Sequence, residues 1–231
     1  MKMFWKKCVR IIKLTLIFFL ASSLLSVIIL RFIPPVATPL MLIRCGEQIW
    51  NGKSLKLKKD WVSFEEISPN LKRAVIASED QRFMDHHGFD FDAIKKAMQY
   101  NKKGKKKVIG ASTISQQVAK NVFLWPSRSW VRKGFEVYFT VLIEIFWSKE
   151  RILEVYLNIV ELGNGVYGAE AASQYYYSIN AKKLSKDQAA LLAAILPNPL
   201  KWSPTKPSMY ILKRRNWIRQ NMARMGKLEL S

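Results

Sequence analysis

The feature that most constrains this chain is an uncharged segment close to its N-terminus. Between Lys13 and Arg31 run 17 residues without a charge, LTLIFFLASSLLSVIIL, and apolar residues at 11–12 and 32–33 extend the segment past both cations. Such cations tolerate the edge of a bilayer because their long aliphatic stems let the charge reach water. An α-helix needs about 20 apolar residues to cross the bilayer core. We therefore expect one transmembrane helix over 11–33.

The charges around this segment predict its orientation. Five cations and no acid precede it, namely Lys2, Lys6, Lys7, Arg10 and Lys13. By the positive-inside rule, residues 1–10 form a cytoplasmic tail and the chain after the helix is exported. A cleaved signal peptide is the alternative, but its apolar core is usually about 7–15 residues long and a small-x-small cleavage site should follow. A buried soluble helix would show a polar face, and this run has none.

Export limits the anionic partners that the strong positive charge can indicate. The net charge is +21, and the part after Arg31 holds 32 of the 38 cations and all 17 acids. DNA is not the natural partner of an exported segment, so no nucleic acid is expected. The excess charge points to anionic lipid head groups or to a phosphorylated lipid substrate. Cys8 and Cys45 would lie on opposite sides of the membrane and cannot pair, and no Cys/His cluster has metal-site spacing.

The exported part is predicted to be mostly α. Residues 34–64 are interpreted as a linker and membrane-proximal segment, with PPVATP (34–39) as an extended spacer and a turn with a basic, irregular stretch around 51–61. Helical periodicity begins near Pro69, so the main domain is expected over 65–231. Further helices are indicated by the capping-box pair Thr113 and Gln116 and by the cap residue Ser148. The segment 129–147 is apolar on nearly every face, which predicts a buried helix.

Two acids in separate segments suggest acid/base chemistry. Glu79 ends an apolar run in AVIASED, and Glu136 opens the apolar helix at 129–147. A carboxylate among apolar neighbours must be paired or accept a raised pKa. Two carboxyl groups are also the minimum set for general acid/base work at a glycosidic centre. A salt-bridged structural acid remains the plainer explanation for either residue taken alone.

Donor groups that suit a polar, phosphate-bearing ligand lie between these acids. Amide and ammonium donors share one helix face at Gln116, Gln117 and Lys120. Cations suited to phosphate oxygens follow, namely Arg128, Arg132 and Lys133. Taken singly, such residues are commonly surface side chains. Their coincidence on an exported, anchored chain favours a site.

Four ordered stretches resemble the signature motifs of the bacterial peptidoglycan glycosyltransferases, also called transglycosylases. The pattern E-D-x-x-F-x-x-H-x-G-x-D is complete in EDQRFMDHHGFD (79–90). The pattern G-x-S-T-x-x-Q-Q is met by GASTISQQ (110–117), and R-K-x-x-E by RKGFE (132–136). The stretch RILEVYLN (151–158) resembles the fourth motif. The likeness covers about residues 65 to 225.

The resemblance implies a lysozyme-like fold with a larger head lobe and a small membrane-proximal lobe. It implies polymerisation of lipid II into β-1,4 glycan strands, with inversion and release of undecaprenyl pyrophosphate. Glu79 resembles the general base, and Glu136 the second glutamate near the pyrophosphate. The resemblance also implies leaving-group contacts from Lys120, Arg128, Arg132 and Lys133, and positioning by Asp80, Ser112, Gln116 and Gln117. It leaves open whether Mg²⁺ or Mn²⁺ assists near Glu136.

The same resemblance implies a place and partners for the protein. An anchored enzyme of this kind belongs in the cell inner membrane, with its catalytic domain in the periplasm beside other cell-wall synthesis proteins. Many relatives add a transpeptidase domain with S-x-x-K and K-T-G motifs. Here SPTK (203–206) is interpreted as a Pro-rich loop, because 25 residues follow it and no K-T-G occurs. We expect glycan synthesis without cross-linking.

Two departures from the family pattern are visible. Ala111 replaces a glycine found in many relatives, and Phe135 stands where some relatives carry a basic residue. Two other classes of function stay open at this point. A lysozyme-like hydrolase would also use an essential Glu, but it has no pyrophosphate to neutralise. A non-catalytic scaffold of the wall-synthesis machinery would tolerate Glu79→Gln.

Overall fold

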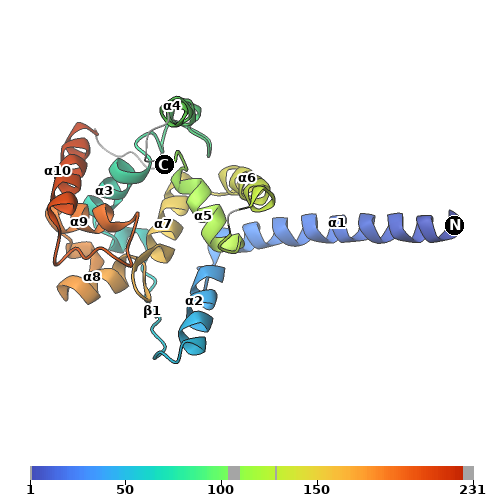
Figure 1. Cartoon of the computed structure of the whole chain (residues 1–231), viewed down its shortest axis with the longest axis horizontal. Coiled ribbons are helices and arrows are strands. Elements are labelled where there is room, and N and C mark those ends of the chain that lie inside the picture. Colours follow the sequence, from blue (N-terminus) through green and yellow to red (C-terminus); the bar gives the residue numbers. More distant parts are fainter. Residues whose placement is uncertain (1, 104–109, 128, 226–231) are drawn as a thin grey trace.

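The computed structural model describes residues 2–103, 110–127 and 129–225, and it is mostly helical. A long helix projects from a helical domain, as Figure 1 shows. The prediction of a mostly α protein is confirmed. The elements in chain order are α1 (Lys2–Phe32), α2 (Pro39–Trp50), β1 (Lys58–Lys59), η1 (Phe64–Glu66), α3 (Pro69–Glu79), α4 (Phe91–Lys102), α5 (Ile114–Phe123), α6 (Trp130–Phe146), α7 (Lys149–Ile159), β2 (Glu161–Gly163), β3 (Val166–Tyr167), α8 (Ala169–Tyr177), η2 (Ala181–Lys183), α9 (Lys186–Ile195) and α10 (Met209–Arg224).

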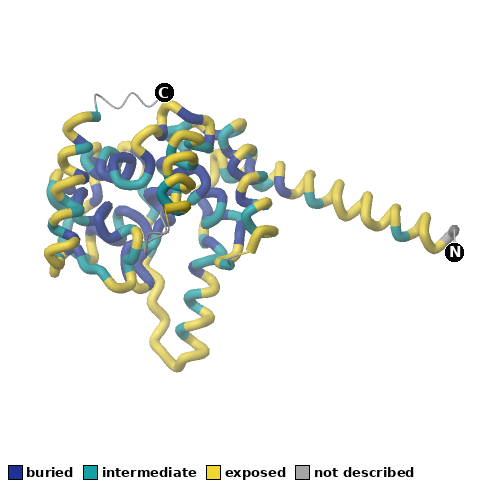
Figure 2. Tube along the Cα trace, turned by 45° about the horizontal axis from the view of Figure 1, so that its top comes forward, coloured by how far each residue is buried: buried dark blue, intermediate teal, exposed yellow. Residues whose placement is uncertain are grey.

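The helix α1 is long and apolar enough over residues 4–32 to cross a membrane. Its 31 residues correspond to about 46 Å, whereas the bilayer core is about 30 Å thick. The helix begins at Lys2, so the segment predicted as a tail continues the same helix. Most of α1 is exposed, as Figure 2 shows. Its buried residues are Ser23 and Val27, and α1 contacts α6.

A helix that was not foreseen lies inside the predicted linker. The sequence predicts an extended spacer at Pro39, but this residue opens α2. The Thr38 hydroxyl caps this helix by accepting from the backbone N–H of Met41 at 3.4 Å. Proline is favoured at the first helical position because its fixed φ already suits the helix. The extended spacer predicted over 34–39 therefore ends at Thr38, and α2 occupies residues for which the sequence predicts no particular structure.

The core forms where the central helices pack together. The helix α9 packs against α3 and α10, and α5 packs against α6 and α7. Alanines dominate α9, and four of them are fully buried, which lets neighbouring helices approach closely: Ala189, Ala190, Ala193 and Ala194. The largest fully buried side chains include Tyr156 of α7, Tyr167 of β3 and Phe83.

Side-chain caps set the predicted helix starts. The capping box of Thr113 and Gln116 is present at α5, and the Ser148 hydroxyl accepts from the Arg151 N–H at 3.1 Å at the start of α7. The helix α7 then ends at Ile159, and a small sheet follows in the order β1-β3-β2, with β1 parallel and β2 antiparallel to β3. Strands of two or three residues are too short for alternation to reveal them in sequence.

The helix α6 differs from its prediction as a buried element. One side packs on α5, and Glu136, Phe139 and Ile143 are buried there. The other side is exposed, with Val131 at 67% and Ile145 at 66%. The helix α6 also contacts the apolar α1. Its exposed apolar face therefore lies on the side of the domain that faces the anchor.

Candidate active site

Two carboxylates from different helices define the candidate site. Glu79 is the last residue of α3, and its side chain is 15% exposed. Glu136 lies in the second turn of α6 and is buried at 3% exposure. The fold thus supplies one carboxylate that solvent or a ligand can reach and one that is enclosed.

The carboxylate of Glu79 is held from three directions. The Gln117 side chain donates to Glu79 Oε2 at 3.2 Å, and the Ser78 hydroxyl donates to Oε1 at 3.0 Å. The Arg214 guanidinium of α10 lies 3.5 Å from Oε1 and donates to Ser78 Oγ at 2.8 Å. The Tyr156 hydroxyl donates to Gln117 Oε1 at 3.2 Å, which fixes the amide that meets Glu79. Glu79 therefore has a defined orientation.

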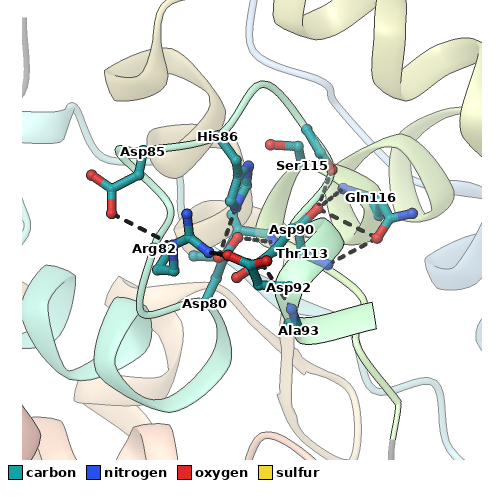
Figure 3. A network of polar contacts seen from close by, with 12 residues as sticks. Asp80, Arg82, Asp85, His86, Asp90, Asp92, Ala93, Thr113, Ser115 and Gln116 are labelled. Carbon is teal, nitrogen blue, oxygen red and sulfur yellow. Dashed lines mark hydrogen bonds and ion pairs between the residues drawn. The ribbon is translucent and has the colours of Figure 1, made fainter. Parts of the chain in front are cut away.

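Asp80 follows Glu79 in sequence but has a different environment (Figure 3). It is buried, and its Oδ1 lies 2.8 Å from His86 Nε2. Its Oδ2 accepts from the backbone N–H of Ile114 at 3.0 Å, at the first residue of α5. Thr113 joins the same turn by donating to the Gly88 carbonyl at 2.7 Å. Asp80 thus ties the end of α3 to the start of α5, which carries Gln117.

An ion pair that is largely shielded from solvent supports this turn. Lys149 Nζ lies 2.9 Å from both carboxylate oxygens of Glu144 and donates to the His86 carbonyl at 2.6 Å. The Ser115 hydroxyl donates to the same glutamate. The ammonium also lies 4.7 Å from the centre of the Phe83 ring. These contacts connect α5, α6 and α7 under the predicted site residues.

Glu136 is surrounded by cations. Arg132 donates to Glu136 Oε2 at 2.6 Å, and Lys133 donates to Oε1. These pairs are i,i+4 and i,i+3 neighbours on α6. In this structure Glu136 is therefore a salt-bridged acid. Its one negative charge is paired with two positive charges.

The ammonium group of Lys120 has a lowered pKa. Burial lowers the pKa of its ammonium, Glu136 and Glu79 act to raise it, and Arg132 and Lys133 add to the lowering. Within the described chain, Lys120 has no carboxylate partner within salt-bridge distance. An ammonium held this way suits an anionic ligand.

Two hollows flank these residues. One of about 300 Å³ is lined by Glu79, Asp80 and Ser112 together with Arg82 and Lys96. The other, of about 510 Å³, is lined by polar residues that include Lys120 and Arg132 and by apolar residues that include Leu124 and Trp125. Glu79 thus lines one cavity, and the cations Lys120 and Arg132 line the other.

The structure brings most of the predicted site residues together, but some line a cavity and others are buried. Glu79, Asp80 and Ser112 share a cavity, and Gln117 contacts Glu79. Gln116 is buried in the capping box of α5, where its side-chain oxygen accepts from the Thr113 N–H at 3.0 Å. Arg128 lies outside the described residues.

Two residues at the site escaped the sequence reasoning. Tyr156 lies within RILEVYLN, but the sequence alone does not predict that its hydroxyl donates to Gln117. Arg214 belongs to the run KRR on α10, where its neighbour Arg215 binds Asp187 at 3.0 Å instead. No sequence signal distinguishes these two arginines.

The donor set at Glu136 does not fit a divalent cation. Both of its carboxylate oxygens accept from basic side chains. Within the ranges that the structure describes, no three residues of the types His, Cys, Asp and Glu gather around a point that could hold a metal ion. Hard cations such as Mg²⁺ need several oxygen ligands. We therefore derive no step through a metal.

Comparison with known proteins places the chain in a family. The family model described as Transglycosylase matches residues 47–223. The chain is 59% identical to the biosynthetic peptidoglycan transglycosylase of Bacteroides thetaiotaomicron over 92% of its own length and 86% of the relative's. The corresponding protein of Bdellovibrio bacteriovorus is 55% identical, covering 92% and 84%. That of Pseudomonas entomophila is 54% identical, covering 91% and 89%. The chain therefore belongs to the transglycosylase family and is a glycosyltransferase of peptidoglycan synthesis.

Proposed function

We propose that this enzyme polymerises lipid II into linear β-1,4 glycan strands, with inversion at the anomeric carbon and release of undecaprenyl pyrophosphate. The observation that carries the proposal is the contrast between the two glutamates. Glu79 is oriented by Gln117 and Arg214 at the edge of a cavity, whereas Glu136 is enclosed with basic residues. A base and a cationic leaving-group site are the two parts that this displacement needs.

In the proposed step, Glu79 takes the proton from the acceptor's 4-hydroxyl. The freed oxygen attacks the anomeric carbon of the growing strand, and the bond from that carbon to the pyrophosphate oxygen breaks. The leaving group keeps the electron pair. Its added charge is stabilised by Lys120, Arg132 and Lys133, of which Arg132 and Lys133 pair with the buried carboxylate of Glu136. The role of Glu136 is to hold Arg132 and Lys133 in position.

The remaining site residues take supporting roles in this proposal. Gln117 holds Glu79, and Asp80 holds the turn from which α5 starts. Ser112 lines the cavity beside Glu79 and is available to a sugar hydroxyl or amide. Gln116 acts indirectly, by capping α5. Arg128 is proposed from its sequence position alone as a further leaving-group contact.

We further propose that α1 holds the enzyme in the cell inner membrane, with the N-terminus cytoplasmic and the catalytic domain periplasmic. The basic residues before the apolar span favour this orientation. A membrane-bound enzyme meets its lipid-linked substrate in two dimensions. The motifs that this sequence contains are those of strand synthesis, and we propose that activity without cross-linking.

The test uses the full chain in detergent with labelled lipid II, and product is followed on a gel. Wild type should form polymer that lysozyme digests, and Glu79→Gln should lower the rate by at least about 10²-fold because a general base is worth about 10²–10⁴. Glu66→Gln is the matched control, since this exposed acid pairs only with Lys182 within the described chain. Circular dichroism checks that each variant is folded.

Three results would contradict the proposal. Folded wild type that makes no polymer would favour the scaffold function. Cleavage of preformed glycan would favour the hydrolase. Full activity in Glu79→Gln would remove Glu79 as the base.

A further inference from the structure

The cavity at Glu79 is lined in part by α4. Its lining residues include Glu79 and Ser112, which the proposed reaction uses. They also include Asp92, Ala93 and Lys96 of α4, to which the proposed reaction gives no role. Residues of α4 are therefore placed to contact the part of the substrate that lies beside Glu79.

The first turn of α4 is held by contacts with the segment that follows Glu79, as Figure 3 shows. The Asp90 carboxylate caps the helix by accepting from the Ala93 N–H at 2.9 Å. Arg82, three residues after Glu79, lies 3.4 Å from Asp90 and also donates to Asp92. These contacts fix the start of α4 beside the candidate base, and the next turn of the helix takes its position from them.

Two neighbouring lysines of α4 face different hollows. Lys96 follows Ala93 by three residues, so the two share a face of the helix, and both line the cavity of Glu79. Lys95 lines a separate hollow together with Ile94 and Met98. Helical periodicity thus directs Lys96 to the cavity and Lys95 away from it.

The two basic residues that line the cavity of Glu79 differ in their partners. Arg82 lies 3.4 Å from Asp90 and 3.9 Å from Asp85, and it contacts Asp92 directly. Lys96 has no carboxylate within salt-bridge distance among the residues that the structure describes. An ammonium without an acidic partner, at the edge of a ligand-sized cavity, favours an anionic group on the ligand.

The proposed substrate carries two kinds of anionic group. One is pyrophosphate, which is fixed to a lipid and so stays near the membrane, on the side where α6 contacts the anchor α1. The other is the set of carboxylates on the peptide stem of the muramyl sugar. In the proposed step the acceptor's 4-hydroxyl lies at Glu79, so its disaccharide and the attached peptide begin in the cavity that Lys96 lines. The peptide carboxylates are therefore the groups that Lys96 is placed to meet.

We propose that Lys96 binds a carboxylate of the acceptor's peptide stem and makes the enzyme selective for stems that carry this charge. The inference rests on the proposed function, which places a muramyl peptide beside Glu79. It gives α4 a role in the choice of substrate, separate from the proton transfer at Glu79 and from the cations Lys120 and Arg132 in the other cavity.

The test compares two forms of lipid II, one with free carboxylates on its peptide stem and one with carboxamides in their place. Binding to the full chain in detergent is measured with Glu79→Gln present throughout, so that the substrate is not consumed. With Lys96 intact, the carboxylate form should bind about three- to tenfold more tightly than the amidated form. Lys96→Met should abolish this preference and leave binding of the amidated form unchanged. Lys96→Arg should keep the preference, because the guanidinium retains the charge.

Lys95→Met is the matched control. It removes the same charge from the adjacent residue of α4, whose side chain lines the separate hollow. This variant should prefer the carboxylate form as strongly as the enzyme with both lysines does. Equal loss of the preference in Lys95→Met and Lys96→Met would assign it to the net charge of α4 and overturn the inference.

Two further results would overturn the inference. One is equal binding of the two substrates when Lys96 is intact. The other is equal weakening of both substrates by Lys96→Met, which would assign Lys96 to a pyrophosphate. Polymerisation by the enzyme with Glu79 intact, assayed in parallel, keeps the two proposals apart. A carboxylate preference without polymer would refute the proposed function alone, and polymer made from both substrates with equal KM would refute this inference alone.

Discussion

The Gln117 side chain donates to Glu79 Oε2 across 3.2 Å and so joins α5 to the last residue of α3. This contact places the candidate base where two helices meet. Its geometry depends on Tyr156 of α7, which holds the other end of the Gln117 amide at 3.2 Å. With Arg214 of α10, four helices therefore determine the orientation of one carboxylate.

Removing the Tyr156 hydroxyl should reduce catalysis more than folding. Tyr156→Phe deletes one hydrogen bond worth about 0.5–1.5 kcal/mol, and we expect kcat to fall on the order of three- to tenfold with KM little changed. Steady-state polymerisation rates check this. Tyr176→Phe is the control, because its hydroxyl donates to the Leu162 carbonyl at 3.0 Å in the small sheet. Equal rates for the two variants would contradict a positioning role for Tyr156.

The two neighbouring arginines of α10 should behave differently. Arg214 lies 3.5 Å from Glu79, whereas Arg215 pairs with Asp187. Arg214→Ala should lower kcat/KM about tenfold or more, since a charge-assisted contact is worth about 1.5–3 kcal/mol. Arg215→Ala should retain activity. Both variants are compared in the same polymerisation assay after their melting temperatures are measured. Similar activity losses would mean that α10 acts only through stability.

The buried pair of Lys149 and Glu144 should be important for stability. Lys149→Met leaves a carboxylate whose side chain is 6% exposed without its cation, and we expect a loss of about 3–5 kcal/mol. Lys182→Met removes an exposed pair with Glu66 and should cost about 0–1 kcal/mol. Denaturant unfolding in detergent measures both. Adding Glu144→Gln to Lys149→Met should recover part of the loss, and no recovery would contradict an unpaired charge as the cause.

Lys120 should make stability depend on pH in a defined direction. Burial lowers the pKa of its ammonium below the ordinary value of 10.5. Between the lowered pKa and 10.5 the unfolded chain binds more protons than the folded one, so the free energy of unfolding gains a term that rises with pH. Lys120→Met removes this term. The difference in stability between wild type and variant, followed from neutral pH to 10.5, should therefore shift in favour of wild type as pH rises. A constant difference would contradict the shift.

Gly165 should tolerate no side chain. Its φ is +72°, and an added Cβ would lie 2.2 Å from the Lys56 carbonyl oxygen. Gly165→Ala should destabilise the protein by more than about 1 kcal/mol, because both the backbone conformation and the space are incompatible. Gly134→Ala on α6 meets no atom within 4 Å and should stabilise by about 0.5–1 kcal/mol. Thermal unfolding of both variants checks the sign, and a neutral Gly165→Ala would contradict the close approach.

The sequence by itself determined the parts of this protein that depend on local chemistry. An uncharged apolar run predicts a membrane-length helix because the bilayer core sets the number of residues. The hydroxyl residues at 113 and 148 predict helix starts because they satisfy free backbone N–H groups nearby in the chain. Glu79 and Glu136 could be proposed as site residues because a residue type and its position in a motif can be read without knowing the fold.

Only the tertiary structure decided which residues meet. Nothing local separates Arg214 from Arg215, and the choice follows from which side of α10 packs toward α3. The burial of α6 could not be derived from its composition, because an apolar face turned toward an anchor or bilayer looks in sequence like one turned toward a core. The contact of Phe19 with Phe135 joins positions 116 residues apart, and only packing of α1 on α6 brings their rings together.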